Sequence, residues 1–172
     1  MAAMNEHSDQ FPSPALSTLR SPTVFLATGL GIGLLGPAPG TLGALEGVAV
    51  AWGLTYLTSI RFAWTGSVIF LLSIGVLLCT RAARQLGGKD PQSIVWDELS
   101  TVPIVFAIVP MTDWKIALLG FGLHRLFDVT KLWPCRHLER LPEGMGIMAD
   151  DIAASIYAAV VLWGVKWMMG MV

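Results

Sequence analysis

The sequence contains little charge. Of its 172 residues, 11 are Lys or Arg and 12 are Asp or Glu, so 13% are charged, whereas 54% are hydrophobic. Soluble domains carry roughly 25% charged residues and about 45–50% apolar ones. The formal net charge of −1, without any basic cluster, argues against a nucleic-acid-binding surface. The composition therefore indicates one domain in contact with a lipid bilayer.

Cysteine is also scarce. The chain has two cysteines, Cys79 and Cys135. Two are too few for a disulfide framework or a cysteine-ligated metal. Cys79 ends an apolar run and is expected to pack as a small hydrophobic side chain. No arginine lies six residues after Cys135, where the phosphate-binding loop of a thiol phosphatase needs one. Catalysis by a cysteine nucleophile is therefore not expected.

Long uncharged runs are frequent. Phe62–Thr80 has no charged residue, and a helix of that length spans about 28 Å, close to the hydrocarbon thickness of a bilayer. Ile152–Met169 is apolar except for Lys166. Weaker candidates for helices in the membrane are Leu42–Ile60, which carries Glu46, Ile94–Met111 and Lys115–Phe127.

These runs predict an all-α, multi-helical integral membrane protein with about five membrane-associated helices. Pro103 is expected to kink or break the third of them. Residues 1–22 are polar and contain three prolines, which predicts a disordered N-terminal tail. Residues 23–172 are then expected to form a single membrane-embedded domain.

The basic residues are distributed unequally. If the five segments alternate in direction, only Arg61, Lys115 and Lys166 fall on one side of the membrane. The other side receives Arg20, Arg81, Arg84, Lys89, Lys131, Arg136 and Arg140. Because basic residues are enriched in cytoplasmic loops, this second side is expected to face the cytoplasm. Most of the acidic residues discussed below fall on the same side, which predicts an active site at the cytoplasmic face.

Two pairs of adjacent carboxylates lie next to apolar segments. Asp97 and Glu98 precede an apolar run, and Asp150 and Asp151 are expected to open the last helix. One acidic residue at a helix N-terminus is ordinary, because it caps the helix or interacts favourably with the helix dipole. A second carboxylate is more than capping needs and is costly to bury as an anion. Both pairs are therefore candidate functional residues.

A glycine- and proline-rich turn, Gly36–Gly43, precedes one apolar segment. Backbone N–H groups at such a helix start can bind an anion. Thr41 is expected either to cap the helix or to direct its hydroxyl at a phosphate or a metal.

Arg125, Asp128 and Lys131 are spaced so that all three would share a 120° arc of one helix. An intrahelical ladder of ion pairs is one interpretation. A phosphate-binding site is the other, because arginine forms bidentate contacts with phosphate and lysine adds a point charge. The neighbouring His124 is expected to pack or to form a hydrogen bond.

Five motifs resemble those of the phosphatidylglycerophosphatase A family, in the same order and at similar spacing, from about Leu26 to Trp163. They are Pro39-Gly-Thr-Leu-Gly43, Ile94-Val-Trp-Asp-Glu98, Arg125-x-x-Asp128-x-x-Lys131, Trp133-Pro134 and Gly144-Met-Gly-Ile-Met-Ala-Asp150-Asp151. Three positions depart from the family pattern, namely Leu132, Cys135 and Glu143, but none of them removes a candidate ligand. Glu46 lies outside the motifs and is either an accessory group or a packing residue.

The resemblance implies an all-helical, Mg²⁺-dependent enzyme of the bacterial inner membrane, which hydrolyses phosphatidylglycerophosphate to phosphatidylglycerol and phosphate. It implies catalytic roles for Asp97, Glu98, Asp128, Asp150 and Asp151. Within that set, the implied metal ligands are Asp97, Glu98, Asp150 and Asp151. The implied phosphate-binding residues are Arg125, Lys131, Thr41 and Gly40.

Two questions stay open at the level of sequence. The nucleophile is either a metal-activated water or a carboxylate, and the absence of an Asp-x-Asp pair favours water. A membrane transporter or channel with a charged site near the cytoplasmic face is the alternative function. A transporter predicts polar groups throughout the bilayer depth or paired halves of the chain, whereas the carboxylates here gather at segment ends on one side.

Overall fold

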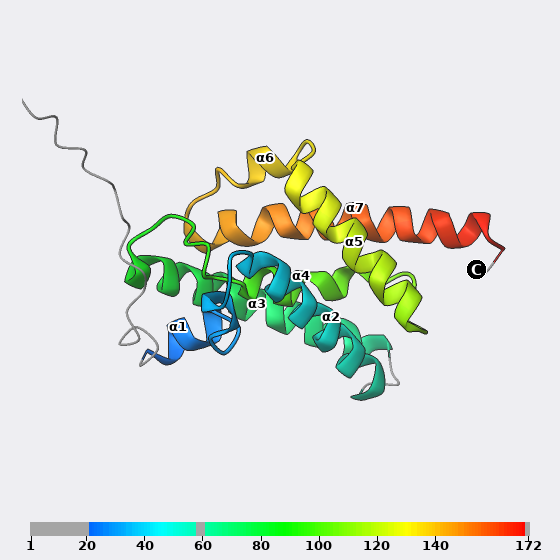
Figure 1. The fold of residues 1–172 in the computed structure, drawn as a ribbon, viewed down its shortest axis with the longest axis horizontal. Helices are drawn as coiled ribbons and strands as arrows, with labels where there is room; N and C mark the ends of the chain where they lie inside the picture. The colour runs from blue at the N-terminus through cyan, green and yellow to red at the C-terminus, as the bar shows by residue number, and fades with distance from the viewer. Residues whose placement is uncertain (1–20, 58–60, 171–172) are drawn as a thin grey trace, which may run out of the picture.

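The fold is described by a computed structural model, which covers residues 21–57 and 61–170. The helices in chain order are α1 (Pro22–Ala27), η2 (Ile32–Leu34, a 3-10 helix), α2 (Pro39–Leu57), α3 (Arg61–Leu86), α4 (Trp96–Val105), α5 (Trp114–Thr130), α6 (Cys135–Leu138) and α7 (Glu143–Met168) (Figure 1). The described residues contain no strand, so the all-α prediction is confirmed. The expected tail, residues 1–22, lies outside the described residues except for its last two, and Pro22 opens α1.

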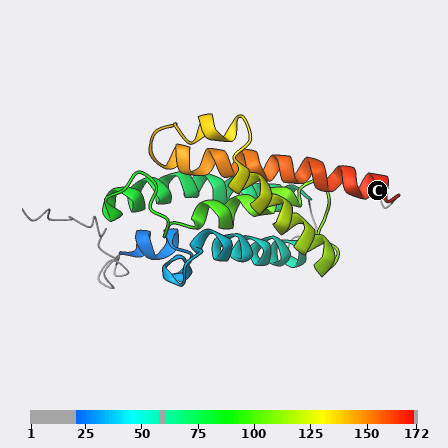
Figure 2. The ribbon, with the colours of Figure 1, turned by 45° about the horizontal axis from the view of Figure 1, so that its top comes forward.

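The short helix α4 lies at the centre of the fold. It packs against α2, α3 and α7, and Figure 2 shows it between α2 and α7. Its residues are buried on several sides, including Val102 and Val105, because a short run of small and β-branched side chains fills the space between longer helices. The side chains of the first turn of α4 are therefore held in the protein interior.

Pro103 lies in the last turn of α4, and the helix ends at Val105. The backbone N–H of Phe106 bonds to the Pro103 carbonyl at 3.0 Å, which closes the helix with a tighter turn. The expected segment Ile94–Met111 is thus a ten-residue helix followed by an irregular stretch. Helix α4 continues through Pro103 for two more residues, so the expected kink or break at this proline stays a prediction.

Two of the described helices are long and apolar enough to cross a bilayer, namely Phe62–Leu86 within α3 and Glu143–Met168, which is α7. The outer surface of α3 carries exposed Phe62, Ile69 and Phe70, as expected for a helix that contacts lipid. The five expected segments correspond to α2, α3, α4, α5 and α7. All five are helical, but α4 and α5 are shorter than a membrane span.

The helices alternate in direction, so their ends gather at two poles. The first turn of α7 meets the end of α3, where the backbone N–H of Gly144 donates to Thr80 Oγ1 at 3.0 Å. The end of α5 meets α7 through Lys131, and the start of α2 meets the start of α4. This pole lies toward the left of Figure 1 and carries the charged residues of the sequence motifs.

The close approach of α2 to α4 depends on glycine. A Cβ atom built at Gly47 would lie 2.7 Å from Val102 Cβ and 2.8 Å from the Glu98 backbone oxygen. A Cβ at Gly43 would lie 2.6 Å from Val95 Cβ. Small residues at such positions let two helix backbones approach closely, which strengthens van der Waals packing in a membrane protein. The position of the α4 first turn therefore depends on these glycines.

We predict that Gly47→Ala destabilises the protein by about 1–3 kcal/mol, because the added methyl group overpacks the interface between α2 and α4. Gly53→Ala is the matched control, since it lies in the same helix and its Cβ would meet no atom within 4 Å. The control is expected to be neutral or stabilising by up to about 1 kcal/mol. The free energy of unfolding is measured by denaturant titration in mixed micelles. Equal stability of the two variants would contradict the close-packing argument.

Candidate active site

A pocket of about 410 Å³ opens at the charged pole. It is bounded by the turn before α2, the first turn of α4, the end of α5 and the second and third turns of α7. All the sequence-predicted site residues line it, namely Gly40, Thr41, Asp97, Glu98, Arg125, Asp128, Lys131, Asp150 and Asp151. Four separate segments of the chain thus bring the predicted set to one place.

Three carboxylates form the inner part of this pocket. One oxygen each from Asp97, Glu98 and Asp151 lies within 4.8 Å of the others, and all three residues are buried. Asp97 Oδ1 and Glu98 Oε2 have no hydrogen-bond partner. Because buried polar atoms are nearly always paired, two free oxygens in one cluster indicate that a further group belongs there.

The electrostatics of the cluster lead to the same conclusion. Burial raises the pKa of Asp97 well above its ordinary value, and the negative charges of Glu98 and Asp151 raise it further. Asp97 and Glu98 occupy the first turn of α4, where the helix dipole favours negative charge. That contribution is small beside the repulsion among three buried anions, so the cluster fits a bound cation.

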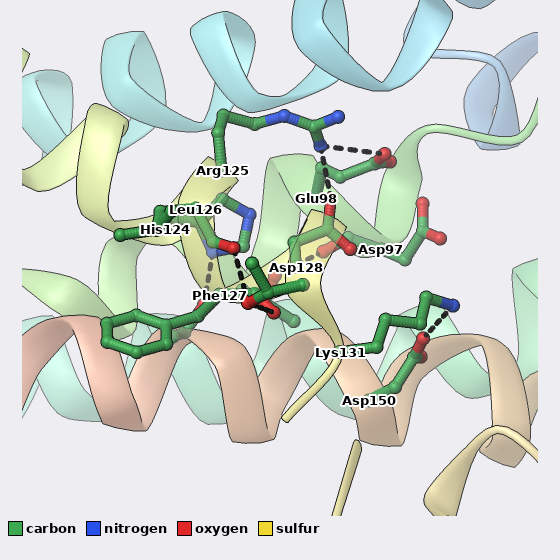
Figure 3. Close-up of polar contacts among 12 residues, drawn as sticks. Asp97, Glu98, His124, Arg125, Leu126, Phe127, Asp128, Lys131 and Asp150 are labelled. Carbon is green, nitrogen blue, oxygen red and sulfur yellow. Dashed lines mark hydrogen bonds and ion pairs between the residues drawn. The ribbon is translucent and has the colours of Figure 1, made fainter. Parts of the chain in front are cut away.

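Arg125 bridges α5 and α4 (Figure 3). Its Nη1 lies 2.6 Å from Asp128 Oδ2 on the same helix and 3.7 Å from Glu98 Oε1. The guanidinium is therefore fixed at the pocket wall by two carboxylates. The pair of Arg125 and Asp128 is the one i,i+3 contact of the possible intrahelical ladder that the structure shows.

Lys131 does not continue that ladder, so the prediction of three charges on one helical arc is wrong. The residue adopts a left-handed conformation, with φ of 44°, and ends α5. Its Nζ lies 2.9 Å from Asp150 Oδ2 on α7 (Figure 3). It also lies 3.2 Å from Glu139 Oε2. Burial lowers the pKa of Lys131, but the hydrogen bonds and charges of Asp150 and Glu139 outweigh it and raise the pKa above its ordinary value. The ammonium group therefore stays charged.

The expectation that Asp150 and Asp151 open the last helix is also wrong. Helix α7 begins at Glu143, so both aspartates lie well inside it and are buried. The early start has a local cause, because Gly144 allows the first turn to pack against α3, where a Cβ would lie 2.3 Å from the Val76 carbonyl oxygen. The two aspartates diverge: Asp151 belongs to the cluster of three, and Asp150 pairs with Lys131.

The turn before α2 forms the opposite wall of the pocket. Helix α2 begins at Pro39, so Thr41 lies inside its first turn and is not the capping residue. A Cβ at Gly40 would lie 2.3 Å from Glu98 Oε1. A side chain at position 40 would thus occupy the space that the Glu98 carboxylate fills.

Two further polar residues lie near the pocket, and each has one buried atom without a hydrogen-bond partner, Nε2 of His124 and Oε2 of Glu46. His124 is buried, and its Nδ1 lies 3.1 Å from Ser155 Oγ on α7, as expected for a hydrogen-bonding histidine. Glu46 packs over Gly29 outside the pocket lining. Cys79 and Cys135 are both buried free thiols.

Sequence reasoning missed three polar residues near the pocket. Asp90 and Gln92 line it from the loop before α4, and Glu139 reaches Lys131 from the segment after α6. Their only sequence signal is position, since each lies on the side of the membrane to which the charged motifs are assigned.

The chain matches the family model described as "Phosphatidylglycerophosphatase A" over residues 25–166. It belongs to the phosphatidylglycerophosphatase A family. Membership of this phosphatase family decides the function of the chain against the transporter or channel alternative.

Curated relatives in the phosphatidylglycerophosphatase A family are similar along most of their length. The chain is 40% identical over 154 residues to the phosphatidylglycerophosphatase A of Haemophilus influenzae, covering 88% of this chain and 93% of the relative. It is 36% identical over 155 residues to that of Escherichia coli, covering 88% and 89%. A third relative, the "Putative phosphatidylinositol-3-phosphatase" of Bacteroides thetaiotaomicron, is 31% identical over 153 residues, covering 86% and 95%. No solved structure matches the chain.

We predict that Gly40→Ala lowers phosphatase activity about tenfold, which corresponds to about 1.4 kcal/mol of transition-state stabilisation. The added methyl group displaces the Glu98 carboxylate and with it the contact to Arg125. Gly53→Ala, in the same helix but away from the pocket, is the control and keeps full activity. Phosphate release by both purified variants is compared at equal concentrations of folded protein. Full activity of Gly40→Ala would show that the phosphatase activity does not depend on where the Glu98 carboxylate lies.

Proposed function

We propose that this pocket is the active site in which the chain hydrolyses phosphatidylglycerophosphate to phosphatidylglycerol and phosphate. The observation that carries the proposal is the juxtaposition of three buried carboxylates, two with unpaired oxygens, with Arg125 and Lys131. A phosphate monoester needs positive charge to bind it and a polarised nucleophile to cleave it. The pocket offers residues suited to both tasks within one lining.

Mg²⁺ is the proposed cofactor, with Asp97, Glu98 and Asp151 as its carboxylate ligands. Hard oxygen donors are the ligands that this ion prefers, together with waters and phosphate oxygens. When bound, Mg²⁺ stabilises the negative charge that develops on a transferring phosphoryl group and lowers the pKa of a bound water. Asp150 was also implied as a ligand, and its pairing with Lys131 supports an orienting role for it instead.

The phosphate-binding role falls to Arg125 and Lys131, each held in place by a carboxylate. Asp128 fixes Arg125, and Asp150 fixes Lys131. The first turn of α2 adds Gly40 and Thr41 to the lining, where the helix N-terminus favours negative charge. These groups would orient the phosphate so that its ester bond faces the carboxylate cluster.

Water is the proposed nucleophile. Asp128 contacts Arg125 and lines the same pocket as Asp97, Glu98 and Asp151. From there its carboxylate can accept a proton from the attacking water.

The proposed location is the bacterial inner membrane, with residues 23–172 as one domain. Two helices are long enough to span it, and the charged pole is proposed to face the cytoplasm. The basic residues support this orientation, since Arg81, Arg84, Lys89, Lys131, Arg136 and Arg140 lie at or near the helix ends of that pole. Lys115 and Lys166 lie near the helix ends of the other pole.

We predict that purified, detergent-solubilised protein releases phosphate from phosphatidylglycerophosphate with Mg²⁺ and loses this activity in EDTA. Asp97→Asn is expected to lower the rate at least about 100-fold, because even outer-shell partners of metal ligands account for 10–100-fold. Binding of Mn²⁺, followed by electron paramagnetic resonance, gives a readout that does not depend on turnover and is expected to weaken in the same variant.

Asp113→Asn serves as the matched control for that experiment. Asp113 is an exposed aspartate that caps α5 at the opposite pole, and asparagine caps helices equally well. Activity in EDTA equal to that in Mg²⁺ would remove the metal from the proposal. Full activity of Asp97→Asn would show that the reaction does not depend on the carboxylate cluster.

The orientation is tested by labelling with a membrane-impermeant maleimide. Both native cysteines are buried, so a single introduced cysteine gives the signal. Arg136→Cys, at the charged pole, is predicted to react only in inverted vesicles. Met169→Cys, exposed at the far end of the candidate spanning helix α7, is predicted to react only in spheroplasts. The reverse pattern would place the active site on the periplasmic face.

A further inference from the structure

A buried hydrogen bond joins α5 to α7 beneath the charged pocket. His124 Nδ1 lies 3.1 Å from Ser155 Oγ, and both side chains are fully buried. Neither residue lines the pocket, so the proposed chemistry does not use them directly. The bond nevertheless connects two helices that each carry carboxylates of the pocket.

Packing alone does not account for an imidazole at this position. Burial lowers the pKa of His124 to about 4, so the ring is neutral at neutral pH and adds no charge beside Arg125. Its Nε2 is buried and has no hydrogen-bond partner among the described residues. An unpaired buried nitrogen is unfavourable, and an apolar ring of similar size would avoid it. What the imidazole adds over such a ring is the bond of its other nitrogen to Ser155.

The bond lies one helical turn below two carboxylates of the pocket. Helix α5 ends at the charged pole and α7 begins there, so the two helices run in opposite directions. Asp128 follows His124 by four residues on α5 (Figure 3), and Asp151 precedes Ser155 by four residues on α7. Residues four apart share one face of a helix, and four residues rise about 6 Å. Both carboxylates therefore lie about one turn nearer the pole than the bond.

A second polar contact between the same helices lies on the pole side of these carboxylates. Lys131 Nζ, at the end of α5, lies 2.9 Å from Asp150 Oδ2 on α7. Asp128 and Asp151 are thus bracketed by an ion pair above them and a buried hydrogen bond below. A hydrogen bond depends on distance and angle, whereas apolar burial is non-directional. The two polar contacts therefore fix how far one helix is shifted along the other.

We propose that the hydrogen bond between His124 and Ser155 is a positioning contact, which sets the place of Asp128 on α5 relative to the carboxylate cluster on α4 and α7. The inference rests on the proposed function, in which Asp128 accepts the proton of the attacking water. The bond touches neither substrate nor metal and acts through one turn of each helix. Its loss is therefore expected to lower kcat rather than to weaken metal binding.

The test compares three single variants of the full-length protein. His124→Phe fills the space of the ring but cannot form the bond, and Ser155→Ala removes the other partner. Each is expected to lower kcat on phosphatidylglycerophosphate about tenfold, a part of the roughly 100-fold that a misplacement of about 1 Å can cost. His124→Asn fills less space but keeps an amide group near the position of Nδ1, so it is expected to lose less than His124→Phe. If ring volume alone mattered, that order would be reversed.

A double variant shows whether the two residues act through one bond. The combined variant His124→Phe and Ser155→Ala is expected to lose no more activity than either single variant, because removing one partner already removes the bond. Phe127 of α5 stacks on Tyr157 of α7 with ring centroids 5.5 Å apart. This contact keeps the two helices packed when the bond is absent.

Metal binding separates positioning from general damage. The affinity for Mn²⁺, followed by electron paramagnetic resonance, is expected to stay at the wild-type value in every variant, because Asp97, Glu98 and Asp151 lie on α4 and α7. Ser73→Ala is the matched control for Ser155→Ala. Ser73 is an exposed serine of α3 that donates to the Ile69 carbonyl oxygen of its own helix at 2.7 Å. The control is expected to keep the wild-type kcat.

Other outcomes overturn the proposal. Wild-type kcat in both His124→Phe and Ser155→Ala would show that the bond does not matter for the reaction. Losses that add in the double variant, or a higher kcat of His124→Phe than of His124→Asn, would assign the two residues to packing. A fall of Mn²⁺ affinity in step with kcat would assign the bond to the stability of the whole bundle. Failure of the proposed function looks different, because the wild type itself would then release no phosphate.

Discussion

The burial of three carboxylates at the first turn of α4 is the constraint on which the rest of the structure depends. Asp97, Glu98 and Asp151 lie within 4.8 Å of one another in the protein interior. Such an arrangement is unfavourable for an isolated protein, since both desolvation and mutual repulsion oppose it. It persists only if the surrounding helices hold the backbone in place, which makes the packing around α4 part of the chemistry.

That packing is achieved by small residues. Gly40, Gly43 and Gly47 place one face of α2 against the first half of α4, and Gly144 brings the start of α7 onto α3. Because a membrane offers no hydrophobic driving force between helices, close backbone contact has to supply the attraction. The same glycines that look like loop or flexibility signals in the sequence therefore determine how rigidly the carboxylates are held.

Much of this arrangement could be predicted from the sequence, and what could not has a physical reason. Charge is rare in this apolar chain, so the acidic pairs, Arg125 and Lys131 stand out in the sequence. The glycine-rich turn stands out because it directly precedes an apolar segment. Helix boundaries were less accessible: Lys131 ends α5 and Asp150 lies inside α7, because tertiary contacts with α6 and α3 decide those boundaries. The ion pair of Lys131 with Asp150 joins two segments 19 residues apart, which no local periodicity encodes.

The charge balance of the pocket has a further consequence for the order of binding. Six carboxylates line it, against the two cations Arg125 and Lys131; they are Asp90, Asp97, Glu98, Asp128, Asp150 and Asp151. Both cations already contact carboxylates, so neither presents its full charge to a ligand. A phosphate monoester would enter a pocket whose fixed charge is negative and would be repelled. A divalent cation between the three clustered carboxylates reverses that field locally. On the proposed Mg²⁺ chemistry, the metal therefore has to bind before the phosphate.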